Sequence, residues 1–362
     1  MDRTGIAQML RKLTEADGPS GAEDAVAAVV RSLVHDYAPE LRVDALGSII
    51  ARRRGAAEPP GCIMLAAHMD EIGLIVTKVE GGFLHVAAIG GVDPRSVLGQ
   101  EVMVYPSGPG SERYPLGLPG YIGSQPAHLL SAGERDQVIP LRDLRIDLGQ
   151  PASFFAGGIV RVGDRVAIRG PYTELLGGRV AVKSLDNRAS VAAMLGALGY
   201  LAGMHHTWDV YAVATVQEEI GLRGAITSAF GLAPDLAIVI DVTFGDTPGV
   251  NGGKTVAMDK GPAIGWGPNL HPGAVKRLKE VADALEIPYI TEPLPGASGT
   301  DAWAVQVTRA GIPTALLGIP IRYMHTAVET VVVADIDRTA RLLAAFISRL
   351  DDAFLGSLAE EV

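Results

Sequence analysis

The sequence predicts an α/β protein: a mixed, mostly parallel sheet that is flanked by helices and interrupted by a small all-β insertion. Short, almost continuous apolar runs alternate with helical stretches along most of the chain, as is typical of strands buried on both faces of a sheet. Between residues 72 and 177 this alternation gives way to short strand-like pieces separated by Gly and Pro. The length of 362 residues is enough for about two domains.

The elements outside the insertion follow from hydrophobic spacing. Residues 6–13 and 22–34 carry apolar side chains at the spacing of amphipathic helices, and residues 18–21 (GPSG) separate them. Strands are expected where the chain is almost wholly apolar, at 48–51, 62–67, 210–216, 236–240 and 314–319. Further helices are expected at 190–201, 273–285, 301–310 and 335–350.

The insertion has no long helical stretch. Its strand-like pieces lie at 74–79, 83–87, 101–105, 144–146 and 165–168. Gly and Pro clusters between the pieces predict turns, so the pieces fit a compact all-β module. We therefore divide the chain into a discontinuous domain of residues 1–71 and 178–362 and an inserted domain of residues 72–177.

Composition excludes several classes of protein. The formal net charge of −10 argues against nucleic acids and anionic membranes as partners, because both attract basic surfaces. No apolar run has the length of a membrane span or a signal peptide, so a cytoplasmic protein is expected. The single cysteine, Cys62, excludes an internal disulfide and a cysteine-rich zinc module.

Imidazole and carboxylate groups follow the predicted strands where each strand ends. His68 and Asp70 follow the strand at 62–67, and the single residue between them places both side chains on one face. The other strand ends carry Asp186, Glu218, Glu219, Asp241 and His325. Because carboxyl ends of parallel strands meet at one edge, and buried carboxylates require compensating charge, this pattern predicts a divalent metal site.

The number of donors suggests how metals are held. His68, His325, Asp186, Glu219 and Asp241 provide five oxygen or nitrogen ligands, enough for two ions if one carboxylate bridges them. Such a set suits Zn, Co or Mn. Glu218 is adjacent to the candidate ligand Glu219 and is not needed as one of the five ligands, so it is the candidate general base.

Six segments taken together resemble one family. They are 67–73 (AHMDEIG), 185–188 (LDNR), 217–225 (QEEIGLRGA), 240–241 (ID), 299–302 (GTDA) and 322–326 (RYMHT). In this order they resemble the tetrahedral aminopeptidases, the glutamyl-aminopeptidase-like dinuclear metallo-aminopeptidases. The resemblance implies a zinc-aminopeptidase-like fold.

The resemblance also implies a role for each ligand. His68 and Asp241 would hold one metal ion, Glu219 and His325 would hold the second, and Asp186 would bridge the two.

The activity implied by the resemblance is removal of N-terminal residues from short peptides. Glu218 would take a proton from a water activated by two metals, and Asp70 would orient His68. Family members carry a β-rich dimerisation module, so the inserted domain is expected to mediate self-association, with dimers forming a homododecamer. His128 in this insertion either lies on the surface or approaches a neighbouring site.

Several alternatives stay open. Thr300 and Asp301 either cap the next helix or line the substrate end of the site. Arg322 either binds an acidic substrate or has a structural role, and His205-His206 is expected to be a solvated turn. Two other kinds of activity are also open. One is a related di-metal deacylase or carboxypeptidase. The other is a carboxylate-pair glycosidase, and this activity would leave His68 and His325 unexplained. The sequence does not indicate which N-terminal residue is preferred.

Overall fold

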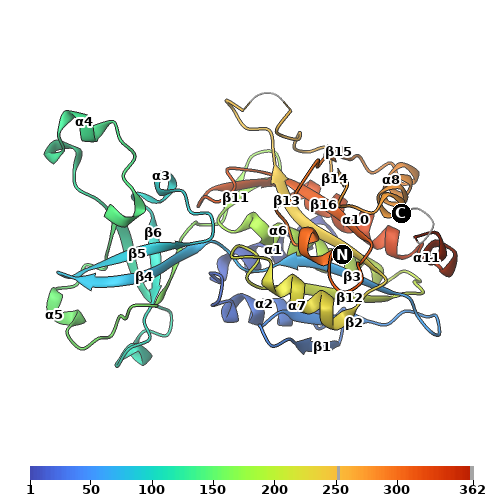
Figure 1. The fold of residues 1–362 in the computed structure, drawn as a ribbon, viewed down its shortest axis with the longest axis horizontal. Helices are drawn as coiled ribbons and strands as arrows, with labels where there is room; N and C mark the ends of the chain where they lie inside the picture. The colour runs from blue at the N-terminus through green and yellow to red at the C-terminus, as the bar shows by residue number, and fades with distance from the viewer. Residues whose placement is uncertain (251–252, 359–362) are drawn as a thin grey trace.

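The computed structural model describes residues 1–250 and 253–358. It consists of a large sheet layered with helices and a small β-barrel that projects from one side of it (Figure 1). The prediction of a mixed α/β fold with a small β-rich insertion is confirmed. No helix within the described residues is both long and apolar enough to span a membrane.

The large sheet has eleven strands, and its centre is parallel. The path runs through β1 (Glu40–Val43), β2 (Ile49–Arg53), β12 (Asp209–Thr215), β3 (Cys62–His68), β13 (Leu236–Phe244), β16 (Thr314–Arg322), β17 (Glu329–Val332), β11 (Arg179–Val182) and β10 (Thr173–Leu175). Strands β14 (Ala263–Trp266) and β15 (Ile290–Pro293) extend it from β16. Strands β12, β3, β13 and β16 are parallel to one another.

The carboxyl ends of five strands therefore lie at one edge of the sheet. Four are the central parallel strands. Strand β11 has the same direction as β16, because both pair antiparallel with β17. Ligand sites in open α/β sheets form at such an edge, where the loops converge.

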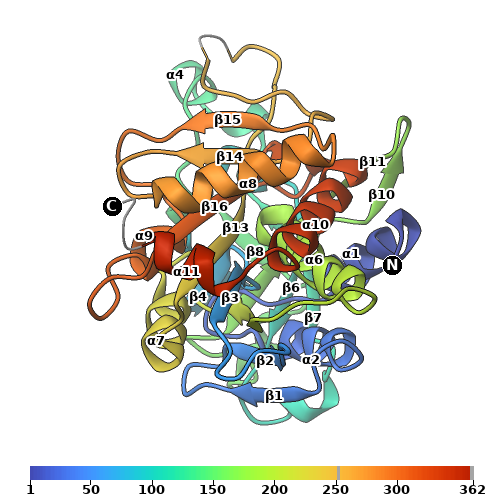
Figure 2. The ribbon, with the colours of Figure 1, turned by 90° about the vertical axis from the view of Figure 1, so that its right-hand side faces the viewer.

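Helices cover both faces of this sheet (Figure 2). Helices α1 (Arg3–Glu15), α2 (Asp24–Val34), α6 (Leu185–Leu201) and α10 (Val333–Ile347) lie on one side, and α7 (Arg223–Leu232) and α9 (Ala302–Val305) lie on the other. Helix α8 (Pro272–Ala284) packs on β14 and β16, and α11 (Asp352–Leu358) packs on α8. Almost every residue of the Ala-rich helix α6 is buried, which is typical of a helix enclosed in a core.

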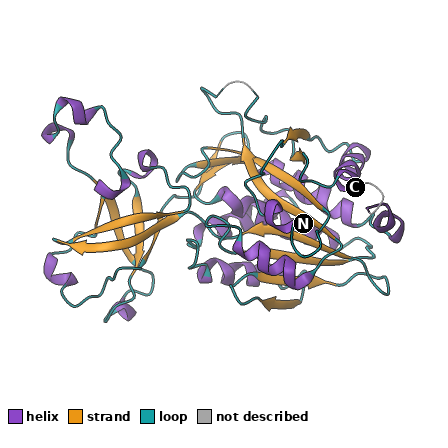
Figure 3. Cartoon of the chain, in the orientation of Figure 1, coloured by secondary structure: helices purple, strands orange, loops and turns teal. Residues whose placement is uncertain are grey.

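The insertion forms a closed, wholly antiparallel barrel. Its strands, in barrel order, are β4 (Gly73–Glu80), β5 (Phe83–Ile89), β8 (Arg145–Asp147), β7 (Leu118–Gly123), β6 (Glu101–Tyr105) and β9 (Arg165–Ile168). Figure 3 shows that only short helical turns accompany these strands, among them α3 (Pro94–Val97), α4 (Ala132–Arg135) and α5 (Ala152–Phe155). The barrel encloses its own apolar core, which includes Leu74, Val86, Val102 and Ile146.

A polar network joins the barrel to the sheet, and its members Asp17, Glu71 and Lys183 are buried. The hydroxyl of Tyr105 in β6 donates to Asp17, and Arg169, just after β9, donates to the same carboxylate at 3.2 Å. Lys183 Nζ lies 3.1 Å from Asp17 Oδ1 and 2.6 Å from Glu71 Oε2. These buried charges are paired, so the network fixes the barrel at the point where the chain enters and leaves it.

Several elements differ from the sequence-based expectation: strands β1, β7, β10, β14, β15 and β17 and helix α7 were not predicted. Two cases have a clear physical reason. The helix expected at 301–310 extends only from Ala302 to Val305, because the chain then turns and Arg309 adopts the left-handed conformation with φ of 56°. Strand β7, with the sequence LPGYIG, was not expected, because two glycines and a proline conceal its alternating burial.

Candidate metal centre

The carboxyl edge of the sheet brings five of the predicted residues into one cluster. Asp186 lies at its centre, with Oδ1 3.1 Å from Nε2 of His68 and Oδ2 3.2 Å from Nε2 of His325. Asp241 Oδ1 lies 3.8 Å from the same nitrogen of His68, and Glu219 Oε1 lies 3.3 Å from that of His325. The two imidazoles thus face opposite oxygens of a single carboxylate.

The donor atoms of this cluster fit divalent cations. Within His68, Asp186 and Asp241, and again within Asp186, Glu219 and His325, one donor atom from each residue lies within 4.8 Å of the others. The two groups share Asp186. All donors are carboxylate oxygens or imidazole nitrogens, a set that suits metals such as Zn, Co or Mn.

The cluster concentrates negative charge in a buried place. Burial alone would lower the pKa of His325, but the hydrogen-bonded carboxylates of Asp186 and Glu219 raise it to about 11. Burial raises the pKa of Asp241 well above its ordinary value, and ionised Asp186 adds to this increase. Carboxylates packed this closely require positive charge beside them, which protonated imidazoles or metal ions supply.

Asp70 organises the turn that carries two of the acidic groups. Its Oδ1 accepts a hydrogen bond from the backbone N–H of Glu218 at 3.0 Å, and its Oδ2 accepts from that of Glu219 at 3.2 Å. Ser20 Oγ donates to the same carboxylate at 2.6 Å. Asp70 also faces His68, whose Nδ1 lies 3.2 Å from the Asp70 carbonyl oxygen and 3.4 Å from Oδ1.

Glu218 lies beside the cluster, and its carboxylate accepts no hydrogen bond from either imidazole of the cluster. Its Oε2 is 3.8 Å from Nε2 of His68. Burial raises the pKa of Glu218 to about 9, with further contributions from the carboxylates of Asp241, Asp301 and Glu219. A carboxylate held this way has a strong affinity for a proton.

His325 is oriented by a residue of the inserted segment. Its Nδ1 lies 3.1 Å from the carbonyl oxygen of Gly91, in the connection that follows β5. A Cβ atom at Gly91 would lie only 2.6 Å from this nitrogen, so the close approach requires glycine. Because a carbonyl only accepts hydrogen bonds, Nδ1 carries the proton and Nε2 faces the carboxylates.

Glu329 is a residue of the site that the sequence analysis missed. This buried carboxylate accepts from the backbone N–H of Asp186 at 2.9 Å and from that of His325 at 2.7 Å. It therefore fixes the backbone of two candidate ligands at once. Its signal in the sequence is slight: a lone Glu at the start of a buried, otherwise uncharged strand, four residues after His325.

A cavity of about 630 Å³ opens onto the cluster. Thr300 lines it, and the Thr300 hydroxyl accepts from the N–H of Ala302 at 3.3 Å. Asp301 is buried and accepts a hydrogen bond from Thr215 Oγ1 at 2.6 Å, and burial raises its pKa to about 6. Arg322 forms an ion pair with Asp246 at 3.1 Å. Of the three predicted substrate-binding residues, Thr300 alone is among the described residues that line this cavity.

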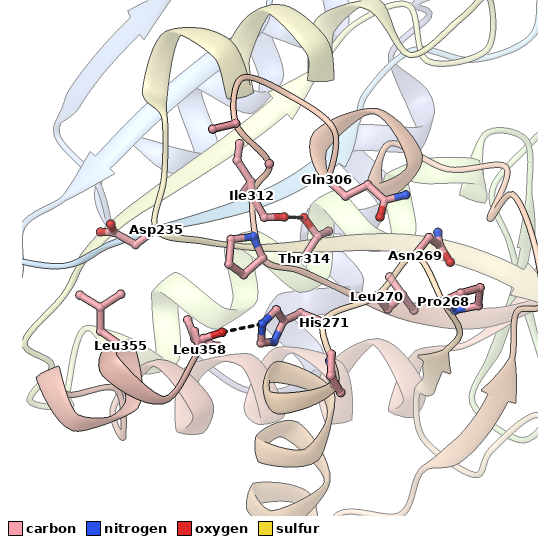
Figure 4. Close-up of a pocket in the computed structure, with 14 residues that line it drawn as sticks. Asp235, Pro268, Asn269, Leu270, His271, Gln306, Ile312, Thr314, Leu355 and Leu358 are labelled. Carbon is pink, nitrogen blue, oxygen red and sulfur yellow. Dashed lines mark hydrogen bonds between the residues drawn. The ribbon is translucent and has the colours of Figure 1, made fainter. Parts of the chain in front are cut away.

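A second cavity, of about 560 Å³, lies at the opposite edge, beside the amino ends of β13 and β16 (Figure 4). His271 lies in it and its Nε2 is 2.9 Å from the carbonyl oxygen of Leu358. The acidic cluster is not part of this cavity.

The expectation of a solvated turn at His205-His206 is wrong for His206. This side chain is buried, and burial lowers its pKa.

Comparison with known proteins gives a consistent result. The sequence model of the M42 glutamyl aminopeptidase family matches residues 47–342. Lysyl aminopeptidase of Pyrococcus furiosus is 37% identical over 95% of this chain and 97% of its own length. An aminopeptidase structure from the archaeon Desulfurococcus kamchatkensis has a TM-score of 0.89 and 36% identity, with 98% of each chain covered. The TET1 peptidase of Pyrococcus horikoshii, which can assemble into a tetrahedron or a large octahedral shell, has a TM-score of 0.81 and 30% identity, covering 95% of this chain and all of that one.

These similarities extend over the large sheet and the barrel alike. They confirm the resemblance to the tetrahedral aminopeptidases, whose members depend on metal ions. The carboxylate and imidazole donors at the carboxyl edge agree with that dependence. The chain therefore belongs to the M42 glutamyl aminopeptidase family and is a hydrolase that acts on peptide bonds.

Proposed function

We propose that this chain is a dinuclear metallo-aminopeptidase that removes N-terminal residues from short peptides. The observation that carries the proposal is the position of Asp186 between two donor groups. His68 and Asp241 would hold one ion, Glu219 and His325 would hold the other, and Asp186 would be shared. Two divalent ions held in this way lower the pKa of water and polarise a carbonyl group.

Glu218 is the general base in this proposal. It lines the cavity and lies outside the five-residue ligand set, with Oε2 3.8 Å from Nε2 of His68, so its carboxylate is placed to accept a proton from the attacking water. It then returns the proton to the amine that leaves. Asp70 holds the Glu218 backbone and faces His68, so it acts as a positioning residue.

The barrel is the proposed means of self-association. We assign residues 1–71 and 178–362 to the catalytic domain and residues 72–177 to a dimerisation domain. The barrel has its own core and projects away from the sheet, which leaves its outer surface free for contact (Figure 1). Since the TET1 relative assembles into closed shells, a homododecamer built from dimers is the expected form. Light scattering on the full chain and on a barrel-surface variant tests it.

The central experiment combines metal analysis with substrate blocking. The metal-loaded enzyme is expected to hold two ions per chain and to cleave aminoacyl p-nitroanilides. Glu218→Gln is expected to keep both ions and lose most turnover, and Glu280→Gln, an exposed residue of α8 outside the barrel, serves as the control. Near-normal turnover of metal-replete Glu218→Gln would contradict the role of Glu218.

Two further measurements separate the alternative activities. An N-acetylated peptide should resist cleavage, since an aminopeptidase requires a free α-amine, whereas a deacylase or carboxypeptidase does not. Complete chelation should abolish peptide hydrolysis, whereas a carboxylate-pair glycosidase would need no metal. The names of the relatives point to different substrates, glutamyl for the family and lysyl for the Pyrococcus furiosus enzyme. The preferred residue must therefore be sought in the cavity of this chain.

A further inference from the structure

The cavity holds one acidic side chain that is neither a candidate metal ligand nor the candidate general base. Glu292 of β15 lines it, together with the candidate ligands and Glu218. Among the described lining residues, no Lys or Arg is present, and Glu292 is the charged group that remains once the cluster and Glu218 are set aside. Glu292 therefore carries a negative charge that the proposed mechanism does not use.

Glu292 is held in place but is not neutralised. Its Oε1 accepts a hydrogen bond from Thr243 Oγ1 at 2.6 Å. Its Oε2 has no hydrogen-bond or ion-pair partner in the part of the chain that the structure describes. The side chain is half-buried, and burial raises the pKa of Glu292 above its ordinary value. A cation beside Oε2 would favour the charged form of this carboxylate.

The position of Glu292 matches the reach of a substrate side chain. Thr243 follows Asp241 by two residues in β13, so both side chains lie on one face. Asp241 is paired with Gly318 of β16, and a Cβ at Gly318 would lie 3.4 Å from Glu292 Oε2. Positions two residues apart along a strand, or directly opposite on a neighbouring strand, are separated by roughly 5–7 Å. The distance from the Asp241 position to the Glu292 carboxylate is therefore close to the length of an extended lysine side chain.

Apolar side chains also line the cavity. Phe244, Leu294 and Met324 contribute to it, beside the hydroxyl groups of Ser298 and Thr300. A lining that combines apolar surface with a carboxylate oxygen lacking an ion-pair partner suits a side chain with a hydrocarbon stem and a charged tip, as in lysine and arginine. A third metal at Glu292 is disfavoured, because one carboxylate and one hydroxyl are too few ligands.

We propose that Glu292 is a specificity-determining residue that selects peptides with a cationic N-terminal residue, lysine or arginine. The proposal rests on the aminopeptidase function proposed above. The α-amine and scissile carbonyl would lie at the cluster, while the cationic side chain extends across Gly318 to pair with Oε2 of Glu292.

The test compares p-nitroanilides of lysine, arginine, norleucine and glutamate with the metal-loaded enzyme. Norleucine matches the lysine stem without its charge. The kcat/KM for lysine and arginine is expected to exceed that for norleucine by roughly 10- to 100-fold, the range of a charge-assisted hydrogen bond. Glu292→Gln should remove most of this ratio, and Glu292→Lys should shift preference to the glutamate substrate. Glu280→Gln, an exposed residue of α8, should leave the ratio unchanged.

The outcomes separate this inference from the function on which it rests. If norleucine and lysine substrates are cleaved equally well, or if Glu292→Gln leaves their ratio unchanged, Glu292 does not set specificity although the aminopeptidase stands. If no aminoacyl p-nitroanilide is cleaved, the proposed function fails and the inference fails with it. Thr243→Val, which removes the hydroxyl that holds Oε1, should lower the ratio by less than Glu292→Gln does.

Discussion

The carbonyl oxygen of Gly91 lies 3.1 Å from Nδ1 of His325, although the two residues are 234 positions apart in the chain. Gly91 comes from the segment that forms the barrel, and His325 follows the central strand β16. The contact sets the tautomer of a candidate metal ligand. The inserted segment thus contributes to the chemistry of the site directly, through a backbone atom.

Gly91→Ala is expected to damage the metal site. A Cβ there would meet Nδ1 of His325 at 2.6 Å, so the imidazole must rotate or the backbone must retreat. Loss of such an orienting contact typically lowers metal affinity or activity by about 10- to 100-fold. Metal titration by calorimetry, together with kcat/KM on one aminoacyl p-nitroanilide, measures the effect.

Gly123→Ala is the matched control. Gly123 also lies in the inserted segment, at the end of β7, and a Cβ there would have no atom within 4 Å. Metal affinity and turnover should therefore equal those of the unaltered protein. Equal losses in the two variants would mean that the effect of Gly91→Ala comes from the barrel as a whole and not from His325.

Glu329→Gln is expected to loosen the two ligands that Glu329 holds. The carboxylate accepts from the N–H groups of Asp186 and His325, whereas an amide offers one acceptor oxygen and turns an N–H₂ group toward the other donor. We expect turnover and metal affinity to fall by about 10-fold or more. Thermal unfolding of the metal-free variant separates this effect from a loss of fold, and a variant with unchanged affinity would refute the positioning role.

Metal removal should lower thermal stability, and the loss should grow as pH rises. Without metal, the pKa of Glu218 is raised to about 9 and that of His325 to about 11, both above their ordinary values. Groups with raised pKa values bind protons more tightly in the folded state, so their contribution is present at low pH and is lost as pH rises. Calorimetric Tm values of metal-free and metal-loaded protein between pH 6 and 9 test this. If the difference in Tm between metal-loaded and metal-free protein becomes smaller as pH rises, the prediction is wrong.

The preference for cationic substrates should itself depend on pH. Burial raises the pKa of Glu292, so acidification protonates it earlier than an exposed glutamate and removes the attraction for lysine. The ratio of kcat/KM for the lysine and norleucine substrates should fall as pH falls. Titrations of the metal ligands and Glu218 affect both substrates and cancel in the ratio. Glu292→Gln should give a ratio that does not change with pH.

Much of the acidic cluster could be predicted because each member follows the apolar run of a strand, although Asp241 lies inside β13, which continues to Phe244. His68, Asp186, Glu219, Asp241 and His325 follow apolar runs that share a direction, so they meet at one edge wherever those runs form a sheet. The strand order itself was not needed for this prediction.

The supporting contacts could not be predicted in the same way. Gly91 acts through a carbonyl oxygen, Glu329 through hydrogen bonds to distant backbone N–H groups, and Glu292 through its place above Gly318. Each depends on the register between segments that are far apart in sequence. Strand β7 escaped prediction for a local reason, since its Gly and Pro residues are typical of turns and conceal the alternating burial of the strand.

The distribution of the candidate ligands along the chain ties the proposed chemistry to both parts of the fold. His68 precedes the barrel segment and His325 follows it, so the two imidazoles meet at Asp186 only when the barrel segment and the strands on either side of it are in place. A fragment cut between the barrel and β16 has no His325 in the second donor group and no Glu329 to accept from the N–H of Asp186. Under the proposed function, such a fragment would have no peptidase activity, even if its remaining part of the sheet folds.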